Sequence, residues 1–148
     1  MAVNAEFVGR TYPPSGPYAV DAAGIAAFAL AVSSTDPVHT DAEAARAAGY
    51  RDVIAPPTFA VSLAQQVDRQ FIADPEAGVD FSRVVHGEQK FVHHRPITAG
   101  DQVLGTLTVD SVRQAGGHTM VTTRAELATD GGEALTTSTS TIVIRGGE

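Results

Sequence analysis

Apolar residues with helical spacing occur first near residue 25 of the chain. They are Ile25, Phe28, Ala29 and Val32, at positions i, i+3, i+4 and i+7. This spacing predicts a helix with one apolar stripe. Asp21 suits its N-cap, because a short polar side chain there accepts hydrogen bonds from free backbone N–H groups. The helix should end before Pro37, since proline disfavours the helical conformation of the residue in front of it.

Two more helices are expected in the first half of the chain. A short one is capped by Thr40 or Asp41 and stops at Gly49. A longer one covers 58–71, with Thr58 as its N-cap. Along it an apolar residue recurs at every fourth position: Phe59, Leu63, Val67 and Phe71. We expect this third helix to be the buried one.

The second half of the chain has the pattern of antiparallel strands. Four strand-like runs, separated by hairpin-type turns, cover about 84–95, 102–113, 118–129 and 133–145. A short strand is also expected at about 18–20. Helices followed by such a meander indicate an α+β fold, in which one antiparallel sheet packs against helix 58–71. The residues expected to be buried are Phe59, Leu63, Val67, Val103, Leu107 and Val109.

Length and composition narrow the class of protein. The 148 residues suit one domain, which we place at 1–148. The absence of cysteine excludes thiol catalysis, Cys-zinc sites and disulfides. A formal net charge of -7 argues against nucleic acid or an anionic membrane as a partner. The chain shows no signal-like N-terminus and no apolar run of about 20 residues, so a cytoplasmic protein is expected.

Two other features suggest little chemistry on their own. His93 and His94 are adjacent and would point to opposite faces of a strand, which is poor geometry for a metal site. No metal and no cofactor are therefore expected. Gly100-Asp101 has the form of a turn, and no chemical role is expected for it.

Three segments, in order, resemble those of a known family. Residues 33–41 read Ser-Ser-Thr-Asp-Pro-Val-His-Thr-Asp and resemble the hydratase motif Gly-Asp-x-Asn-Pro-(Ile/Leu)-His-x-Asp. Residues 49–59 begin with Gly-Tyr and end with Ile-Ala-Pro-Pro-Thr-Phe, and they resemble the Gly…Ile-Ala-His-Gly-Met stretch that opens the central hot-dog helix. Residues 91–101 resemble the Phe…(Lys/Arg)-Pro-(Val/Ile)-x-x-Gly-Asp turn between hot-dog strands.

By this resemblance, which extends over about residues 6–145, the chain is identified as a member of the MaoC-like hot-dog dehydratase/hydratase family. It is most similar to the small actinobacterial accessory subunits of the Had 3-hydroxyacyl-ACP dehydratase. The resemblance implies a helix wrapped by an antiparallel sheet. It also implies syn removal or addition of water at a 3-hydroxyacyl thioester carried on CoA or acyl carrier protein. In the family an Asp and a His share the proton transfers, and a helix-start N–H stabilises the thioester oxygen.

The resemblance also shows where this chain departs from the motif. His39 falls on the motif His, but Ser34 falls on the motif Asp, and a serine hydroxyl is no base near neutral pH. Asp36 falls on the motif Asn and would substitute only if the loop were rebuilt. Pro57 falls on the motif Gly and has no backbone N–H to donate.

Three functional interpretations stay open. The first is an accessory subunit that shapes the substrate channel of a homodimer or heterodimer with a second hot-dog subunit, which carries the dyad. The second is a self-sufficient hydratase that uses His39 with Asp36 or Ser34. The third is a non-enzymatic domain that binds acyl thioesters. All three predict a cavity between the 33–41 loop and the start of helix 58–71. Its candidate substrate-binding residues are Pro57, Thr58, Phe59, His86 and Gln89, of which His86 is expected to share a strand face with Glu88.

Overall fold

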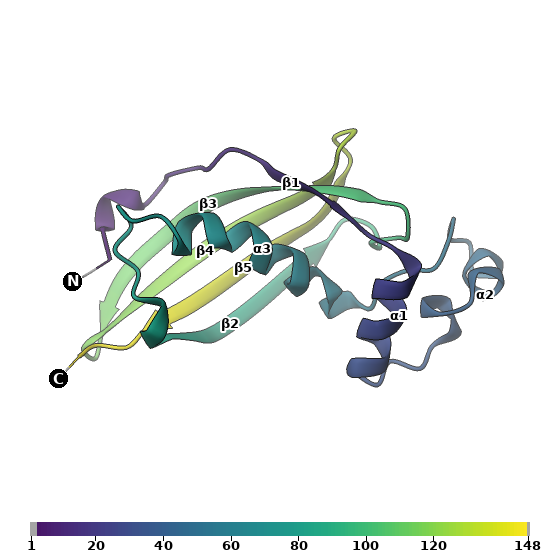
Figure 1. Ribbon diagram of the computed structural model, residues 1–148, viewed down its shortest axis with the longest axis horizontal. Coiled ribbons are helices and arrows are strands. Elements are labelled where there is room, and N and C mark those ends of the chain that lie inside the picture. The colour runs from purple at the N-terminus through teal and green to yellow at the C-terminus, as the bar shows by residue number, and fades with distance from the viewer. Residues whose placement is uncertain (1–2, 148) are drawn as a thin grey trace.

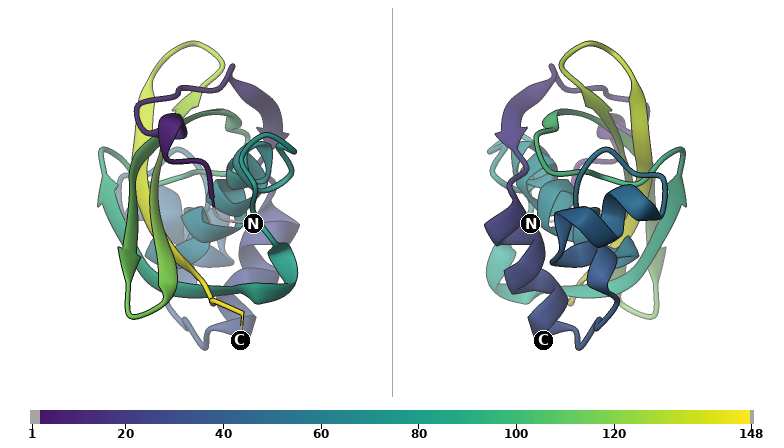
Figure 2. Two further views of the ribbon diagram at one scale, coloured as in Figure 1. Left: turned by 90° about the vertical axis from the view of Figure 1, so that its left-hand side faces the viewer. Right: turned by 90° about the vertical axis from the view of Figure 1, so that its right-hand side faces the viewer.

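The computed structural model describes residues 3–147 and contains one five-stranded antiparallel sheet (Figure 1). The strands are β1 (Ser15–Ala19), β2 (Val84–His93), β3 (Gln102–Ala115), β4 (His118–Thr129) and β5 (Ala134–Ile144). Their order across the sheet is β1-β3-β4-β5-β2, so β2 is an edge strand. The sheet curves around helix α3 (Ala60–Ile72), as an end-on view shows (Figure 2). The expected α+β fold is confirmed.

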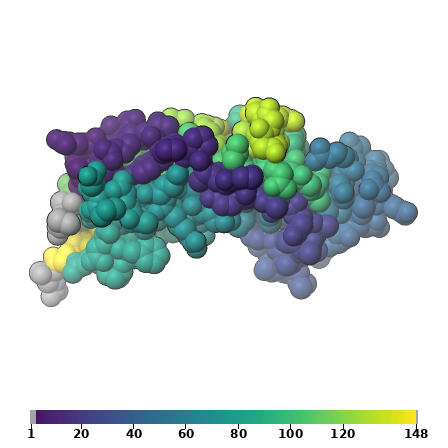
Figure 3. All heavy atoms as spheres, turned by 45° about the horizontal axis from the view of Figure 1, so that its top comes forward, coloured from purple at the N-terminus to yellow at the C-terminus, as the bar shows by residue number. Residues whose placement is uncertain are grey.

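The other helices, α1 (Ala22–Ala31) and α2 (Ala42–Ala47), lie together at one end of the sheet (Figure 3). Asp21 caps α1 as expected, because its Oδ1 accepts a hydrogen bond from Gly24 N–H at 2.6 Å. Asp41 is the N-cap of α2. Gly49, with a φ of +97°, follows α2 in the left-handed conformation that glycine favours.

One predicted cap is wrong. Thr58 does not cap α3, because the 3-10 turn Pro57–Phe59 runs directly into the helix and no side chain caps either element. Proline at this position already has the backbone angle of a helix and lacks one of the N–H groups that a cap would satisfy. β1 also begins earlier than expected, at Ser15 rather than at residue 18.

The core lies between α3 and the concave face of the sheet. Every residue expected to be buried is buried: Phe59, Leu63, Val67, Val103, Leu107 and Val109. Gly105 lies on the same face of β3 as Val103 and Leu107. An ideal Cβ on Gly105 would lie 2.1 Å from Val67 Cγ2, so glycine is what permits this close approach of α3 to the sheet. Within residues 3–147, no helix is long and apolar enough to cross a membrane.

Candidate functional site

A cleft of about 640 Å³ opens near the end of the sheet that carries α1 and α2. Its walls come from segments 36–39, 48–57 and 93–97, and each segment overlaps one of the three stretches that carry the family resemblance. The lining residues are Asp36, Val38, His39, Ala48, Tyr50, Ile54, Ala55, Pro56, Pro57, His93, His94, Arg95, Pro96 and Ile97. The fold therefore brings the three motif segments together around one hollow.

His39 is the buried polar group of this cleft, with 6% of its surface exposed. Its Nδ1 lies 2.7 Å from the carbonyl oxygen of Ile54. A carbonyl can only accept a hydrogen bond, so Nδ1 must carry the proton. In the neutral ring Nε2 is then the unprotonated nitrogen, and it is the one that can accept a proton. Ile54 N–H in turn donates to Val38 O at 3.0 Å, so two hydrogen bonds connect segment 36–39 to segment 48–57.

Ser34, at the motif Asp position, does not line the cleft. It lies just after α1, where its N–H donates to Ala29 O at 2.8 Å. The residue before it, Ser33, has a φ of +57°, in the left-handed region. The chain therefore reverses at the end of α1, and Ser34 does not share the hollow with His39.

Asp36 does line the cleft, and it is the only carboxylate among the lining residues of the described chain. Its Oδ1 accepts a hydrogen bond from Val38 N–H at 3.0 Å and so caps the 3-10 turn Pro37–His39. One of its two oxygens is thus used in holding the turn that presents His39.

The start of α3 offers a different set of donors from the family motif. Pro57 lines the cleft and has no N–H. Phe59 N–H already donates to Pro56 O at 2.9 Å, and the Phe59 ring packs edge-on against Phe28 at a centroid distance of 5.5 Å. Thr58 is exposed and does not line the cleft, but its N–H has no acceptor within residues 3–147. The free helix-start N–H is therefore displaced from the cleft lining.

His93 and His94 line the opposite wall. His93 Nδ1 lies 2.9 Å from Thr136 Oγ1, and His94 Nε2 lies 3.1 Å from Thr137 Oγ1. Their partners are successive residues of β5, so the two imidazoles lie on opposite faces of the sheet. No group of three His, Asp or Glu side chains suited to a metal ion occurs in the described part of the chain.

His86 and Gln89 lie along β2, outside the cleft lining. Gln89 bridges two buried serines of β5: its Nε2 donates to Ser138 Oγ at 2.6 Å, and its Oε1 accepts from Ser140 Oγ at 2.8 Å. The expectation that His86 shares a strand face with Glu88 is wrong. A register shift between them pairs His86 with Ile142 and Glu88 with Thr141, because Gly87 permits a bulge.

Asp68 of α3 is a buried carboxylate that sequence reasoning missed. Only 9% of its surface is exposed, and Thr123 Oγ1 donates to its Oδ1 at 3.1 Å. Burial raises the pKa of Asp68 to about 6, although the Thr123 hydrogen bond and the nearby His86 act to lower it. The sequence does contain a signal for its burial. Asp68 follows Val67 and precedes Phe71 by three positions, so on a helix it lies beside the apolar stripe that faces the sheet.

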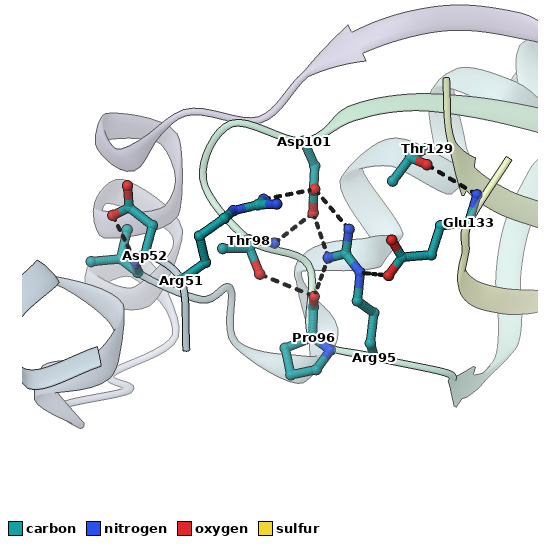
Figure 4. Close-up of polar contacts among 9 residues, drawn as sticks. Arg51, Asp52, Arg95, Pro96, Thr98, Asp101, Thr129 and Glu133 are labelled. Atoms are coloured by element: carbon teal, nitrogen blue, oxygen red, sulfur yellow. Dashed lines mark hydrogen bonds and ion pairs between the residues drawn. The ribbon is translucent and has the colours of Figure 1, made fainter. Parts of the chain in front are cut away.

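Sequence reasoning also missed a cluster of polar side chains around Asp101, which connects the cleft wall to the start of β3 (Figure 4). Asp101, expected only as part of a turn, is 4% exposed and accepts a forked pair of hydrogen bonds from Arg95 at 2.8 and 2.9 Å. It also accepts from Thr98 N–H at 2.8 Å and from Arg51 at 3.2 Å. Burial acts to raise the pKa of Asp101, but these donors and the charge of Arg95 outweigh it and hold the pKa below its usual value. Arg95 also pairs with Glu133.

Comparison with known proteins decides the family. The model described as FAS1-like, dehydratase domain region, matches residues 6–138. The chain belongs to this family. Among relatives of this chain, UPF0336 protein Lxx02810 of Leifsonia xyli subsp. xyli is 49% identical over 148 residues, which is 100% of this chain and 99% of that protein. UPF0336 protein SCO4636 of Streptomyces coelicolor is 44% identical with the same coverage.

Solved structures agree with this assignment. The C-terminally truncated HadBC (3R-hydroxyacyl-ACP dehydratase) complex from Mycobacterium tuberculosis matches with a TM-score of 0.82 and 30% identity, over 93% of this chain and 96% of that one. The (R)-hydratase from A. caviae matches with a TM-score of 0.71 over 95% and 96% of the two chains, and at 21% identity it shows the fold alone. The chain thus has the hot-dog fold of MaoC-like dehydratases, as the resemblance predicted.

Proposed function

We propose that the chain is the substrate-shaping accessory subunit of a cytoplasmic (3R)-hydroxyacyl-thioester dehydratase or enoyl hydratase. One observation carries this proposal: the cleft around His39, as the described residues line it, has no carboxylate at the motif Asp position. Ser34 lies outside the lining, and Asp36 caps the turn beside His39. A partner hot-dog subunit would supply the complete dyad.

The reaction explains why one imidazole does not suffice. Dehydration requires a base that takes the α proton and an acid that gives a proton to the leaving 3-hydroxyl group. In His39 the Nδ1–H donates to Ile54 O, so only Nε2 is available for proton transfer. A second group must then act at the other atom. Among the described lining residues Asp36 is the only carboxylate, and one ring nitrogen of each of His93 and His94 is already hydrogen-bonded to a threonine of β5.

The oxyanion element supports the same conclusion. Pro57 replaces the helix-start N–H that would stabilise charge on the thioester oxygen, and the free Thr58 N–H lies outside the cleft lining. General acid–base catalysis contributes about 10²–10⁴-fold, and loss of an oxyanion donor costs roughly 10²–10³-fold. The isolated chain should therefore be several decades slower than a hydratase with both elements.

The cleft itself suits an acyl thioester. Its volume of about 640 Å³ lies within the range of about 300–1,000 Å³ that is typical of small-molecule sites. Much of its wall is apolar, from Val38, Ile54, Ala55 and Ile97, and its polar lining includes three histidines. Such a wall would accommodate the acyl part of a CoA or acyl-carrier-protein substrate.

A hot-dog partner would also cover the exposed edge of the sheet. β2 pairs with β5 on one side only, so its outer edge presents unpaired backbone groups. Val85 and Val92 of β2 are 43% and 60% exposed. Two similar structures, the HadBC and ChsH1-ChsH2 complexes from Mycobacterium tuberculosis, each contain two different subunits. We propose a heterodimer as the working form and a homodimer when the chain is alone.

The position of Asp36 in the cleft favours one alternative function. In this alternative the chain is a self-sufficient hydratase that uses His39 with Asp36. Hydration of crotonyl-CoA by the purified chain separates the two. The accessory role predicts a rate several decades below that of a dyad-bearing hydratase. If the chain alone works at an ordinary rate, and both His39→Ala and Asp36→Asn abolish that rate, the self-sufficient function replaces our proposal.

A further inference from the structure

We infer that Asp101 is a positioning residue for His39, which it does not touch. It acts through the backbone of two loops, 51–55 and 95–98, which are hydrogen-bonded to each other at the cleft wall. This inference rests on the proposed function only in taking the cleft around His39 as the substrate channel, and its test observes the imidazole itself and needs no activity.

The first step is the way Asp101 fixes both loops. Its carboxylate is almost fully buried and accepts the forked pair from Arg95 together with Thr98 N–H, which lie at the two ends of loop 95–98 (Figure 4). Arg51, from the other loop, donates to Asp101 Oδ1 at 3.2 Å. Arg95 Nη1 also donates to Pro96 O at 2.8 Å, inside the loop. A buried carboxylate with four such bonds has little freedom to move, because each lost bond removes stabilisation from a charge that water cannot reach.

The second step joins these loops at Ile54. Ile54 pairs with Thr98 in an isolated antiparallel bridge. Backbone hydrogen bonds on both sides of that pair connect segments 53–55 and 97–99: Ala55 N–H to Ile97 O at 2.7 Å, and Ala99 N–H to Val53 O at 3.0 Å. The position of the Ile54 peptide is therefore set by the loop that Asp101 holds.

The third step is the imidazole. Ile54 O accepts the Nδ1–H of His39 at 2.7 Å, while Ile54 N–H donates to Val38 O. A carbonyl fixed at this point selects the Nδ1–H tautomer and so leaves Nε2 unprotonated toward the cleft. Without Asp101, loop 95–98 would lose the carboxylate that binds Arg95 and Thr98 N–H. Ile54 would then shift, and His39 would lose its preference for one tautomer.

The test is ¹⁵N NMR of the histidine side chains in the folded protein at alkaline pH, with His39→Gln to assign the His39 signals. In the wild type we expect a protonated Nδ1 and an unprotonated Nε2 for His39. In Asp101→Asn we expect these two distinct signals to merge toward the average of a tautomer mixture. A folded Asp101→Asn protein with the wild-type His39 signals would overturn the inference.

Three further variants keep the test decisive. Arg95→Gln removes the fork but leaves the Thr98 contact, so it should produce the same change to a smaller extent. If Asp101→Asn does not fold, unchanged His39 signals in folded Arg95→Gln overturn the inference. Asp130→Asn removes a carboxylate from a second hollow, which Asp130 lines together with Arg95 and Asp101, and should leave His39 unchanged. Val121→Ala weakens the core elsewhere, and a shift of the His39 signals in this variant would reduce the effect to general destabilisation.

Discussion

His39 and Ile54, fifteen positions apart in the chain, are joined by a hydrogen bond of 2.7 Å between the imidazole Nδ1 and the carbonyl oxygen. Loss of the donor would leave a buried carbonyl unpaired, which costs about 1–3 kcal/mol. We therefore expect His39→Ala to lower the free energy of unfolding by about that amount. His39→Asn should cost less, because its amide can donate from nearly the same position as Nδ1. Urea unfolding measures both, and equal losses for the two variants would show that the hydrogen bond is not what His39 contributes.

Gly105 and Val67 give a second prediction, about the contact of α3 with the sheet. Gly105→Ala places a Cβ against Val67 Cγ2, so the helix must shift, and overpacking of this kind costs typically about 1–3 kcal/mol. The double variant Gly105→Ala with Val67→Ala should regain part of that loss, which a double-mutant cycle would reveal. Fully additive losses in thermal unfolding would contradict a direct steric contact.

Asp68 predicts a specific dependence of stability on pH. Burial raises its pKa from 3.8 to about 6, so the folded state binds the proton more tightly than the unfolded state. Its contribution to the free energy of unfolding is therefore present at low pH and is lost as the pH rises from about 4 to 6, by up to about 3 kcal/mol. Asp68→Asn removes the buried charge and should be more stable than the wild type at pH 8, with a smaller difference at pH 4. A less stable Asp68→Asn protein at pH 8 would mean that the charged carboxylate is well solvated or paired.

The exposed edge of β2 predicts where a partner subunit binds. The double change Val85→Lys with Val92→Lys should weaken association, because it places charges along the edge strand. Val8→Lys, at a similarly exposed valine outside β2, is the matched control. Analytical ultracentrifugation of each variant, alone and with a dyad-bearing subunit, measures the effect. Loss of association in the control, or none in the β2 variant, would place the interface elsewhere.

The fold could be predicted because its signals are local and repeated. Phe59, Leu63 and Val67 recur at helical spacing, and the residues of β3 alternate, so burial of one face followed directly. The bulge beside His86 and the absent Thr58 cap were not predicted, although Gly87 and the Pro56-Pro57 pair were visible in the sequence. Both depend on how one residue is accommodated by its neighbours in space.

The candidate site could be predicted only in part. The motif comparison pointed to His39, and the structure places it in the cleft with Asp36 and Pro57. The Asp101 cluster was missed because one of its partners, Arg51, lies 50 positions away along the chain, and only the folded chain brings it beside Arg95 and Asp101. Asp68 was missed because only the packing of α3 against the sheet buries its carboxylate, and this burial is what raises its pKa.

The hydration rate of crotonyl-CoA in a reconstituted complex tests the central claim most directly. We would combine this chain with a hot-dog dehydratase subunit that carries the complete Asp/His dyad, and compare the complex with each subunit alone. We expect the hydration rate of the complex to exceed that of this chain alone by several decades. His39→Ala in this chain should leave most of the turnover, and loss of the partner's dyad should abolish it. A complex that keeps its activity without the partner's dyad but loses it with His39→Ala would contradict the accessory role and place the chemistry in this chain.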